Sequence, residues 1–178
     1  MSQQENICER IRFLREAGVV PRCHTFGAPD PTYTIGQHSW NATNLLLLLH
    51  PDPEPVLIKA IMWHDAAERF TGDVPAPVKW NNPILGQELD RVERLILEKY
   101  DMYHDLTPYQ LSWLHAVDRL ELFLWCHGRL FTFQDIRFQG MFNTLLDYFE
   151  RTPPPPQVKL VLDRWIPGRL RDDITGSD

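Results

Sequence analysis

The sequence contains little cysteine, no long apolar run and no excess of positive charge, and each absence narrows the class of protein. Its three cysteines, Cys8, Cys23 and Cys126, are scattered and none has the C-x-x-C spacing of a cysteine metal site. This usage predicts neither a disulfide framework nor a cysteine-bound zinc ion, and it is typical of a reducing compartment. No apolar run is longer than the five leucines at 45–49, which are far too few to span a bilayer.

The charge balance argues against a nucleic-acid-binding protein. The formal net charge of the 178 residues is -6, whereas a nucleic-acid-binding surface needs a basic face. We therefore expect no nucleic-acid partner and no membrane association, although a local basic pocket for one small anion is compatible with this charge. The first residues are charged and lack the apolar stretch of a secretory leader, so we expect a cytoplasmic protein.

Strand-like alternation and internal repeats are also absent, and helical periodicity replaces them. The apolar spacing predicts an all-α fold, a single compact helical bundle in one domain over residues 1–178. The expected helices lie at 5–17, 37–50, 56–70, 83–100, 107–128, 138–149 and 158–165. Between them, 19–35 reads as irregular, 71–79 as a loop whose prolines forbid helix, and 153–156 as a stiff polyproline connector before the last helix and a frayed, charged tail.

The central expected helix carries the most informative residues. His64 and Asp65 interrupt an apolar, alanine-rich stretch, and Glu68 follows at the spacing of one helical turn. Two polar groups near a core need partners, and a divalent metal ion would satisfy both. A carboxylate one turn away suits the base that a metal-activated water requires. A hydrogen-bonded core pair without a metal is the alternative.

Two further polar residues fall within apolar helices. They are His38, in the helix before the central one, and Asp118, within the apolar stripe of 107–128. Singly, His38 reads as a capping residue and Asp118 as a salt-bridge partner of Arg119. Taken together in the order H…HD…D, two imidazoles and two carboxylates suit one divalent cation with open positions for water.

Four segments in register give this skeleton a family resemblance. They are Gln37-His38-Ser39, the letters HDAAE at 64–68, TGDVPAPVK at 71–79, and Ala116-Val117-Asp118. Together they resemble the HD-domain phosphohydrolase superfamily, and within it they are most similar to the HD-domain 5′-deoxynucleotidases. The resemblance covers roughly residues 7–150.

The resemblance implies roles for particular residues. It makes His38, His64, Asp65 and Asp118 the ligands of a divalent metal such as zinc, cobalt or manganese, with magnesium as a further candidate beside a triphosphate. It makes Glu68 and Asp73 catalytic carboxylates, and Lys79 a residue that could reach a phosphate or be an ordinary solvated lysine. Arg22 falls near the place where these nucleotidases hold an arginine followed by a tryptophan at the sugar and phosphate. Here Cys23 and His24 follow instead. We expect Arg22, Cys23 and His24 to contact the substrate, but the departure from the family pattern weakens the inference of deoxyribose selectivity.

Two reactions fit the resemblance. The chain is short and is similar to compact phage-type HD enzymes, so we expect a dATP triphosphohydrolase that releases deoxyadenosine and triphosphate. The alternative is a 5′-deoxynucleotidase that hydrolyses deoxynucleoside monophosphates. A non-catalytic metal- and nucleotide-binding regulator is a second alternative, but a pure binding protein has no need of Glu68 and Asp73. From such relatives we also expect a homo-oligomer, either a dimer or a hexamer.

Overall fold

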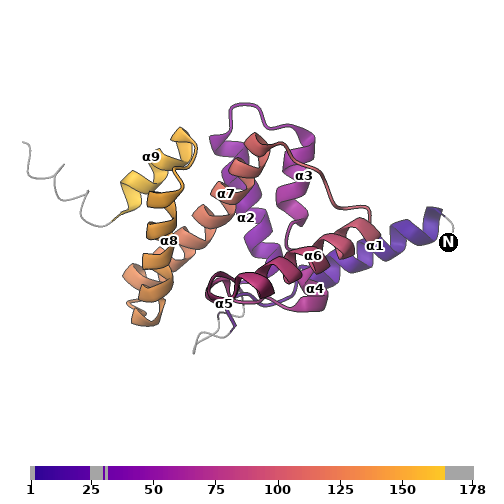
Figure 1. The fold of residues 1–178 in the computed structure, drawn as a ribbon, viewed down its shortest axis with the longest axis horizontal. Helices are drawn as coiled ribbons and strands as arrows, with labels where there is room; N and C mark the ends of the chain where they lie inside the picture. Colours follow the sequence, from indigo (N-terminus) through magenta and orange to yellow (C-terminus); the bar gives the residue numbers. More distant parts are fainter. Residues whose placement is uncertain (1–2, 25–29, 31, 167–178) are drawn as a thin grey trace, which may run out of the picture. The chain divides into compact units, whose positions relative to one another are not determined.

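The computed structural model describes residues 3–24, 30 and 32–166, and it is helical (Figure 1). Its elements are α1 (Gln3–Ala17), α2 (Ile35–Leu49), α3 (Pro55–Trp63), α4 (Glu68–Thr71), α5 (Ala76–Asn81), α6 (Pro83–Lys99), α7 (Pro108–His127), a π-helical turn η1 (Gly128–Thr132), a 3-10 turn η2 (Ile136–Phe138), α8 (Gln139–Arg151) and α9 (Pro156–Trp165). Within these residues the only strand-like pairing is an isolated bridge between Pro21 and Thr34. The all-α prediction is confirmed; the tail expected to fray lies outside the described residues.

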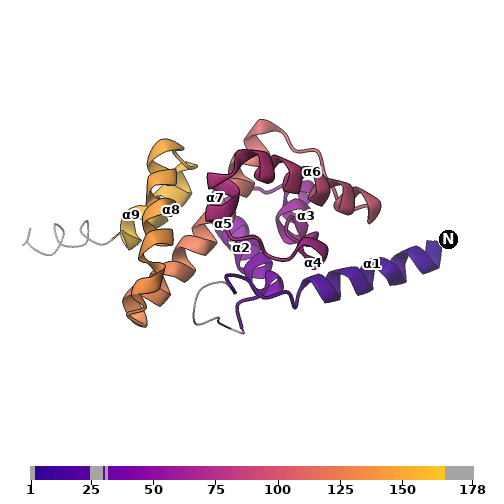
Figure 2. The same ribbon diagram turned by 60° about the horizontal axis from the view of Figure 1, so that its bottom comes forward.

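The helices fall into two compact units along the chain. The first unit contains residues 1–43 and 54–105, and the second contains 44–53 and 106–178, so α2 begins in one and ends in the other. In the first unit α4 packs against α1 and α6 (Figure 2), and in the second α7 packs against α8 and α9. The single domain expected from the sequence stays a prediction. None of the described helices is long and apolar enough to cross a membrane.

The core of the first unit fixes the turn between α3 and α4. Phe13 of α1 stacks on Tyr100 at the end of α6, with ring centroids 4.0 Å apart. Ala66 and Ala67, in the turn, are buried in the same cluster. Because alanine adds no side chain beyond Cβ, the backbone of the turn can approach these rings closely. The turn that carries His64 and Asp65 is therefore anchored from behind by apolar packing.

The prediction of one continuous helix over 56–70 is wrong. α3 ends at Trp63, and a turn over 64–67 separates it from α4. The Ala66 amide donates to the Trp63 carbonyl at 2.9 Å and the Glu68 amide to that of Asp65 at 3.0 Å, which is the tighter three-residue spacing of a 3-10 turn. Local alanine propensity favoured helix here, and burial of Ala66 and Ala67 in the core overrides it.

The prediction that prolines exclude helix from 71–79 is also wrong for its last residues. Helix α5 begins at Ala76, with Pro75 as its N-cap residue and a proline in its first turn. A proline at this place loses no intrahelical hydrogen bond, because the first amides of a helix have no partner within it. The other expected helices are confirmed, with ends shifted by up to two residues.

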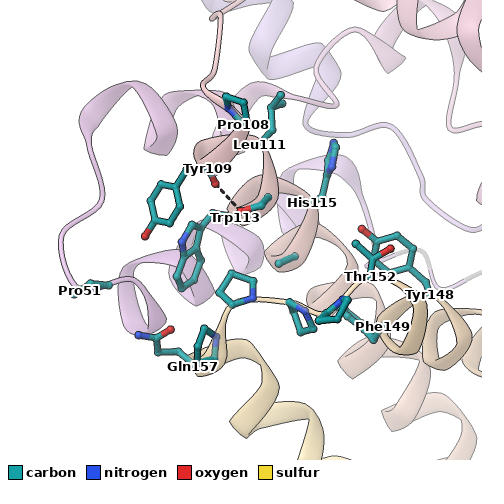
Figure 3. A pocket seen from close by; sticks show the side chains of 16 residues that line it. Pro51, Pro108, Tyr109, Leu111, Trp113, His115, Tyr148, Phe149, Thr152 and Gln157 are labelled. Carbon is teal, nitrogen blue, oxygen red and sulfur yellow. Dashed lines mark hydrogen bonds between the residues drawn. The ribbon is translucent and has the colours of Figure 1, made fainter.

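A cavity of about 700 Å³ lies within the second unit (Figure 3). It is bounded by the first half of α7, the end of α8 and the proline connector, with Tyr109, Trp113 and Tyr148 among its lining side chains. The connector is non-helical over 153–155, and Pro156 begins α9. No residue that the sequence predicted for the functional site lines this cavity.

Close packing of two glycines joins α2 to the end of α1. The Gly36 amide donates to the Gly18 carbonyl at 3.1 Å, and a Cβ added to Gly36 would lie 2.8 Å from that oxygen. We expect Gly36→Ala to lower the free energy of unfolding by about 1–3 kcal/mol, since backbone must shift to admit a methyl group. Denaturant unfolding measures the change. Gly140→Ala is the control, because its Cβ meets nothing within 4 Å in α8; equal effects of the two substitutions would contradict the packing account.

Candidate active site

Three of the predicted metal ligands converge in the first unit. His38 comes from the first turn of α2, and His64 and Asp65 come from the turn after α3. The Asp65 Oδ2 atom lies 3.5 Å from His38 Nε2 and 3.2 Å from His64 Nε2. One donor atom from each residue lies within 4.8 Å of the other two. The neighbouring pair in the sequence thus meets a histidine from a different helix.

The surroundings of the two imidazoles orient them toward Asp65. His64 Nδ1 lies 2.7 Å from the Ile61 carbonyl oxygen, which accepts its hydrogen, so Nε2 presents a lone pair. His38 is fully buried, with its ring 5.4 Å from that of His64 and edge-on to Tyr33. A histidine fixed through one nitrogen by a backbone carbonyl is the usual arrangement of a metal ligand.

The geometry and chemistry of these donors fit a divalent metal ion. Donor atoms about 2.1 Å from one ion at tetrahedral angles lie about 3.4 Å apart, close to the two nitrogen–oxygen separations given above. Two imidazoles and a carboxylate suit zinc, cobalt or manganese. Which metal binds, and the role of each of the three residues as a ligand, stay predictions.

Arg22 lies against this cluster. Its guanidinium forms an ion pair with Asp65 Oδ2 and lies 4.0 Å from Glu68 Oε2, while its amide donates to the Tyr33 carbonyl at 2.9 Å. Burial works to raise the pKa of Asp65, but the neighbouring His64 and Arg22 outweigh it and hold that pKa well below its usual range. The cluster therefore keeps Asp65 ionised, as a metal ligand must be.

Glu68 is the most deeply buried carboxyl of the site, with only 4% of its side chain exposed. Burial raises its pKa to about 9, and the Asp65 carboxylate acts in the same direction against the opposing effect of Arg22. The pKa values of Asp65 and Glu68 are thus shifted in opposite directions. Without metal, Asp65 is ionised and Glu68 protonated near neutral pH. Such a pair of carboxyls can divide metal binding and proton transfer between them.

Asp73 anchors the segment that carries Arg22. Its Oδ2 atom accepts a hydrogen bond of 2.6 Å from the Cys23 amide and lies 3.9 Å from His24 Nδ1. Gly72, with φ of +73°, turns the chain out of α4 just before it. Cys23, predicted to bind substrate, is itself buried with φ of +52°. The structure therefore gives Asp73 a clear positional contact; its catalytic role stays a prediction.

Lys79 reaches the site from α5. Its Nζ atom lies 3.9 Å from Glu68 Oε1 and 3.5 Å from Glu93 Oε1, so the reading of Lys79 as a merely solvated side chain is not supported. Glu93, on α6, was missed from the sequence. The available signal was its place on the apolar stripe of that helix, four residues after Leu89 and four before Leu97.

Asp118 lies on α7, in the second unit, and its side chain is partly buried. Its expected salt-bridge partner Arg119 donates to the His115 carbonyl at 3.2 Å and places its guanidinium 4.2 Å from the Tyr148 ring centroid. The role of Asp118 as the fourth metal ligand stays a prediction.

Comparison with known protein families identifies the family of this chain. The family model described as 5′-deoxynucleotidase YfbR-like matches residues 34–163. The chain belongs to the YfbR-like 5′-deoxynucleotidase family. The match includes His38, the 64–68 motif, Asp73, Lys79 and Asp118, whereas Arg22, Cys23 and His24 precede it. The predicted membership of the HD-domain phosphohydrolases, a family of metal-dependent hydrolases, is confirmed.

Similar proteins carry the same designation. The chain is 35% identical over 66 residues to the 5′-deoxynucleotidase PM0747 of Pasteurella multocida, which is 34% of this chain and 33% of that protein. It is 34% identical over 67 residues to the 5′-deoxynucleotidase VP0926 of Vibrio parahaemolyticus, covering 34% of each. The matched segments thus span about a third of these relatives.

A solved structure shares the fold. The PH0347 protein from Pyrococcus horikoshii OT3 superposes with a TM-score of 0.62 over 89% of this chain and 95% of that chain, at 17% identity. This similarity concerns the fold alone. The expected homo-oligomer and cytoplasmic location stay predictions.

The donor cluster yields a test of metal binding. We expect one divalent ion per chain. His64→Ala should weaken its binding by at least 10-fold, about 10–100-fold in all, since a ligand is lost. Elemental analysis after dialysis against a chelator buffer measures the content. His50→Ala, outside the cluster, is the control. Asp118→Asn, treated identically, tests the fourth ligand; full metal content in His64→Ala would contradict the site.

The raised pKa of Glu68 yields a test by stability. Because the unfolded state releases this proton near pH 4.5 and the folded state keeps it until about pH 9, metal-free protein should lose stability as pH rises between these values. Glu68→Gln removes this dependence, so its stability relative to wild type should increase by up to about 1.4 kcal/mol per pH unit from pH 5 to 8. Chemical unfolding in chelator measures it. A pH-independent difference would show that Glu68 has an ordinary pKa.

Proposed function

We propose that the chain is a metal-dependent 5′-deoxynucleotidase, which hydrolyses 2′-deoxynucleoside 5′-monophosphates to deoxynucleoside and phosphate. The observation that carries the proposal is the cluster of His38, His64 and Asp65 beside the deeply buried carboxyl of Glu68, in a chain of this family. The expected dATP triphosphohydrolase gives way to what was its alternative. The family and the similar proteins are designated 5′-deoxynucleotidases, and no relative named above is a triphosphohydrolase.

His38, His64, Asp65 and Asp118 would hold the metal. When bound, a divalent ion supplies a water of lowered pKa and a positive charge for the phosphate oxygens. The two imidazoles and Asp65 fix the place of the reaction, because their donor atoms converge and His64 is oriented by the Ile61 carbonyl.

Proton transfer falls to Glu68. Hydrolysis breaks the bond between phosphorus and the 5′-oxygen, and that oxygen must gain a proton as it leaves. Burial raises the pKa of Glu68 to about 9 in the metal-free site, so this carboxyl favours its protonated form, which suits a general acid. Its conjugate base can then accept a proton from water and restore the resting state.

Two cations flank the acid. Arg22 lies 4.0 Å from Glu68 Oε2 and Lys79 lies 3.9 Å from its Oε1 atom. Both can stabilise negative charge on the phosphoryl oxygens during transfer. The segment of Arg22, Cys23 and His24, tied down by Asp73, is the candidate contact with the sugar. A pure nucleotide-binding regulator would not need an acid buried between two cations.

A product analysis separates the reactions. With manganese, cobalt or zinc present, we expect deoxynucleoside and orthophosphate in equal amounts from deoxynucleoside monophosphates, because one phosphoester bond is broken. The matched ribonucleotides and dATP are assayed in parallel, and His64→Ala serves as the inactive control. Inorganic triphosphate from dATP, with the monophosphates untouched, would establish the triphosphohydrolase instead. Binding without turnover of any nucleotide would leave the regulator.

A further inference from the structure

Glu93 contacts the site from outside every motif that defines it. It lies on α6, and its Oε1 atom is 3.5 Å from Lys79 Nζ. Its side chain is only 15% exposed, unlike the exposed carboxylates elsewhere on the same helix such as Glu88. A partly buried acid on an apolar stripe is costly unless a partner compensates its charge, and Lys79 is that partner.

The same face of α6 also contacts the backbone of Lys79. Gly86 precedes Glu93 by seven residues, or two turns, so both lie on one side of the helix. A Cβ added to Gly86 would lie 3.3 Å from the Lys79 carbonyl oxygen and 3.9 Å from its Cβ. α6 therefore fixes Lys79 at both ends, the main chain against Gly86 and the ammonium against Glu93.

The contact with Glu93 favours the charged form of Lys79 and restricts the position of its ammonium. Burial alone would lower the pKa of Lys79, but the neighbouring acids, Glu93 above all, outweigh it, and the pKa is raised. A lysine side chain has several rotatable bonds, so an ammonium without a fixed partner samples many positions. With Glu93 in place, the positive charge stays within 3.9 Å of Glu68 Oε1.

We propose that Glu93 is a positioning residue that holds the Lys79 ammonium beside Glu68, where it can bind a phosphoryl oxygen of the substrate. The identity of the substrate rests on the function proposed above, whereas the control of Lys79 by Glu93 does not. Glu93 acts only through Lys79 and does not touch the reacting atoms.

Chemical labelling tests the contact without substrate. Acetic anhydride at pH 8 modifies unprotonated amines, and mass spectrometry of the peptide containing Lys79 gives its rate. We expect Glu93→Gln to speed labelling of Lys79 by at least about threefold, since losing the carboxylate lowers the amine's pKa and frees it. Glu88→Gln, which removes an exposed carboxylate paired with Arg91 on the same helix, should leave the rate unchanged. Equal rates in Glu93→Gln and wild type would overturn the proposal.

Kinetics on a deoxynucleoside monophosphate test the consequence. We expect Glu93→Gln to raise KM by about fivefold or more with kcat within about threefold, because binding of the phosphate is weakened and Glu68 is retained. In a Lys79→Met background, Glu93→Gln should have no further effect. An equal rise of KM in that background would show that Glu93 does not act through Lys79.

A conservative variant guards against loss of folding. Glu93→Asp keeps the charge and shortens the side chain by one methylene, so labelling and KM should both change by an intermediate amount. If Glu93→Gln does not fold, Glu93→Asp carries the test, and wild-type values for it would overturn the proposal. If no nucleotide is hydrolysed at all, the proposed function fails, and the labelling rates still decide the role of Glu93.

Discussion

The carboxylate of Asp65 is the point on which the site depends. Its Oδ2 atom faces His38 and His64 and forms the ion pair with Arg22. Three segments far apart in sequence thus meet at one oxygen. An ionised carboxylate with so little exposure requires this much positive or polar compensation, and in turn it opposes ionisation of Glu68. One charge therefore gathers the metal-binding groups and adds to the burial that raises the pKa of the neighbouring Glu68.

The position of that carboxylate is set by packing rather than by helix propensity. Ala66 and Ala67 are buried in the same apolar cluster as the stacked Phe13 and Tyr100 rings, which anchors the turn that carries Asp65. On the other side Asp73 holds the Cys23 amide and so brings Arg22 to the same point. Apolar burial supplies the fixed frame, and a small number of polar contacts orient the charged groups within it. This division suits an active site, where a displacement of one ångström is costly.

The sequence predicted the helices and the chemical groups better than their connections. Apolar periodicity located the long helices, and the H…HD motif located His38, His64 and Asp65 because rare polar residues in apolar helices are conspicuous. The sequence did not predict the break in the helix after Trp63. Alanine favours helix locally, and only packing in the tertiary core reverses that preference. Glu93 was missed because its meaning depends on where α6 packs, which no local pattern states. The preference for a triphosphate rested on the short chain and its similarity to compact phage-type enzymes, and the family match favours the monophosphate.

Kinetics of Glu68→Gln show whether Glu68 is the proton donor of a site assembled around Asp65. The amide matches the shape of the protonated acid but cannot give up a proton. We expect kcat for a deoxynucleoside monophosphate to fall by about 10²–10⁴-fold while the metal content of the protein and KM change little. An unchanged kcat with a raised KM would contradict it, since Glu68 would then bind substrate without taking part in proton transfer.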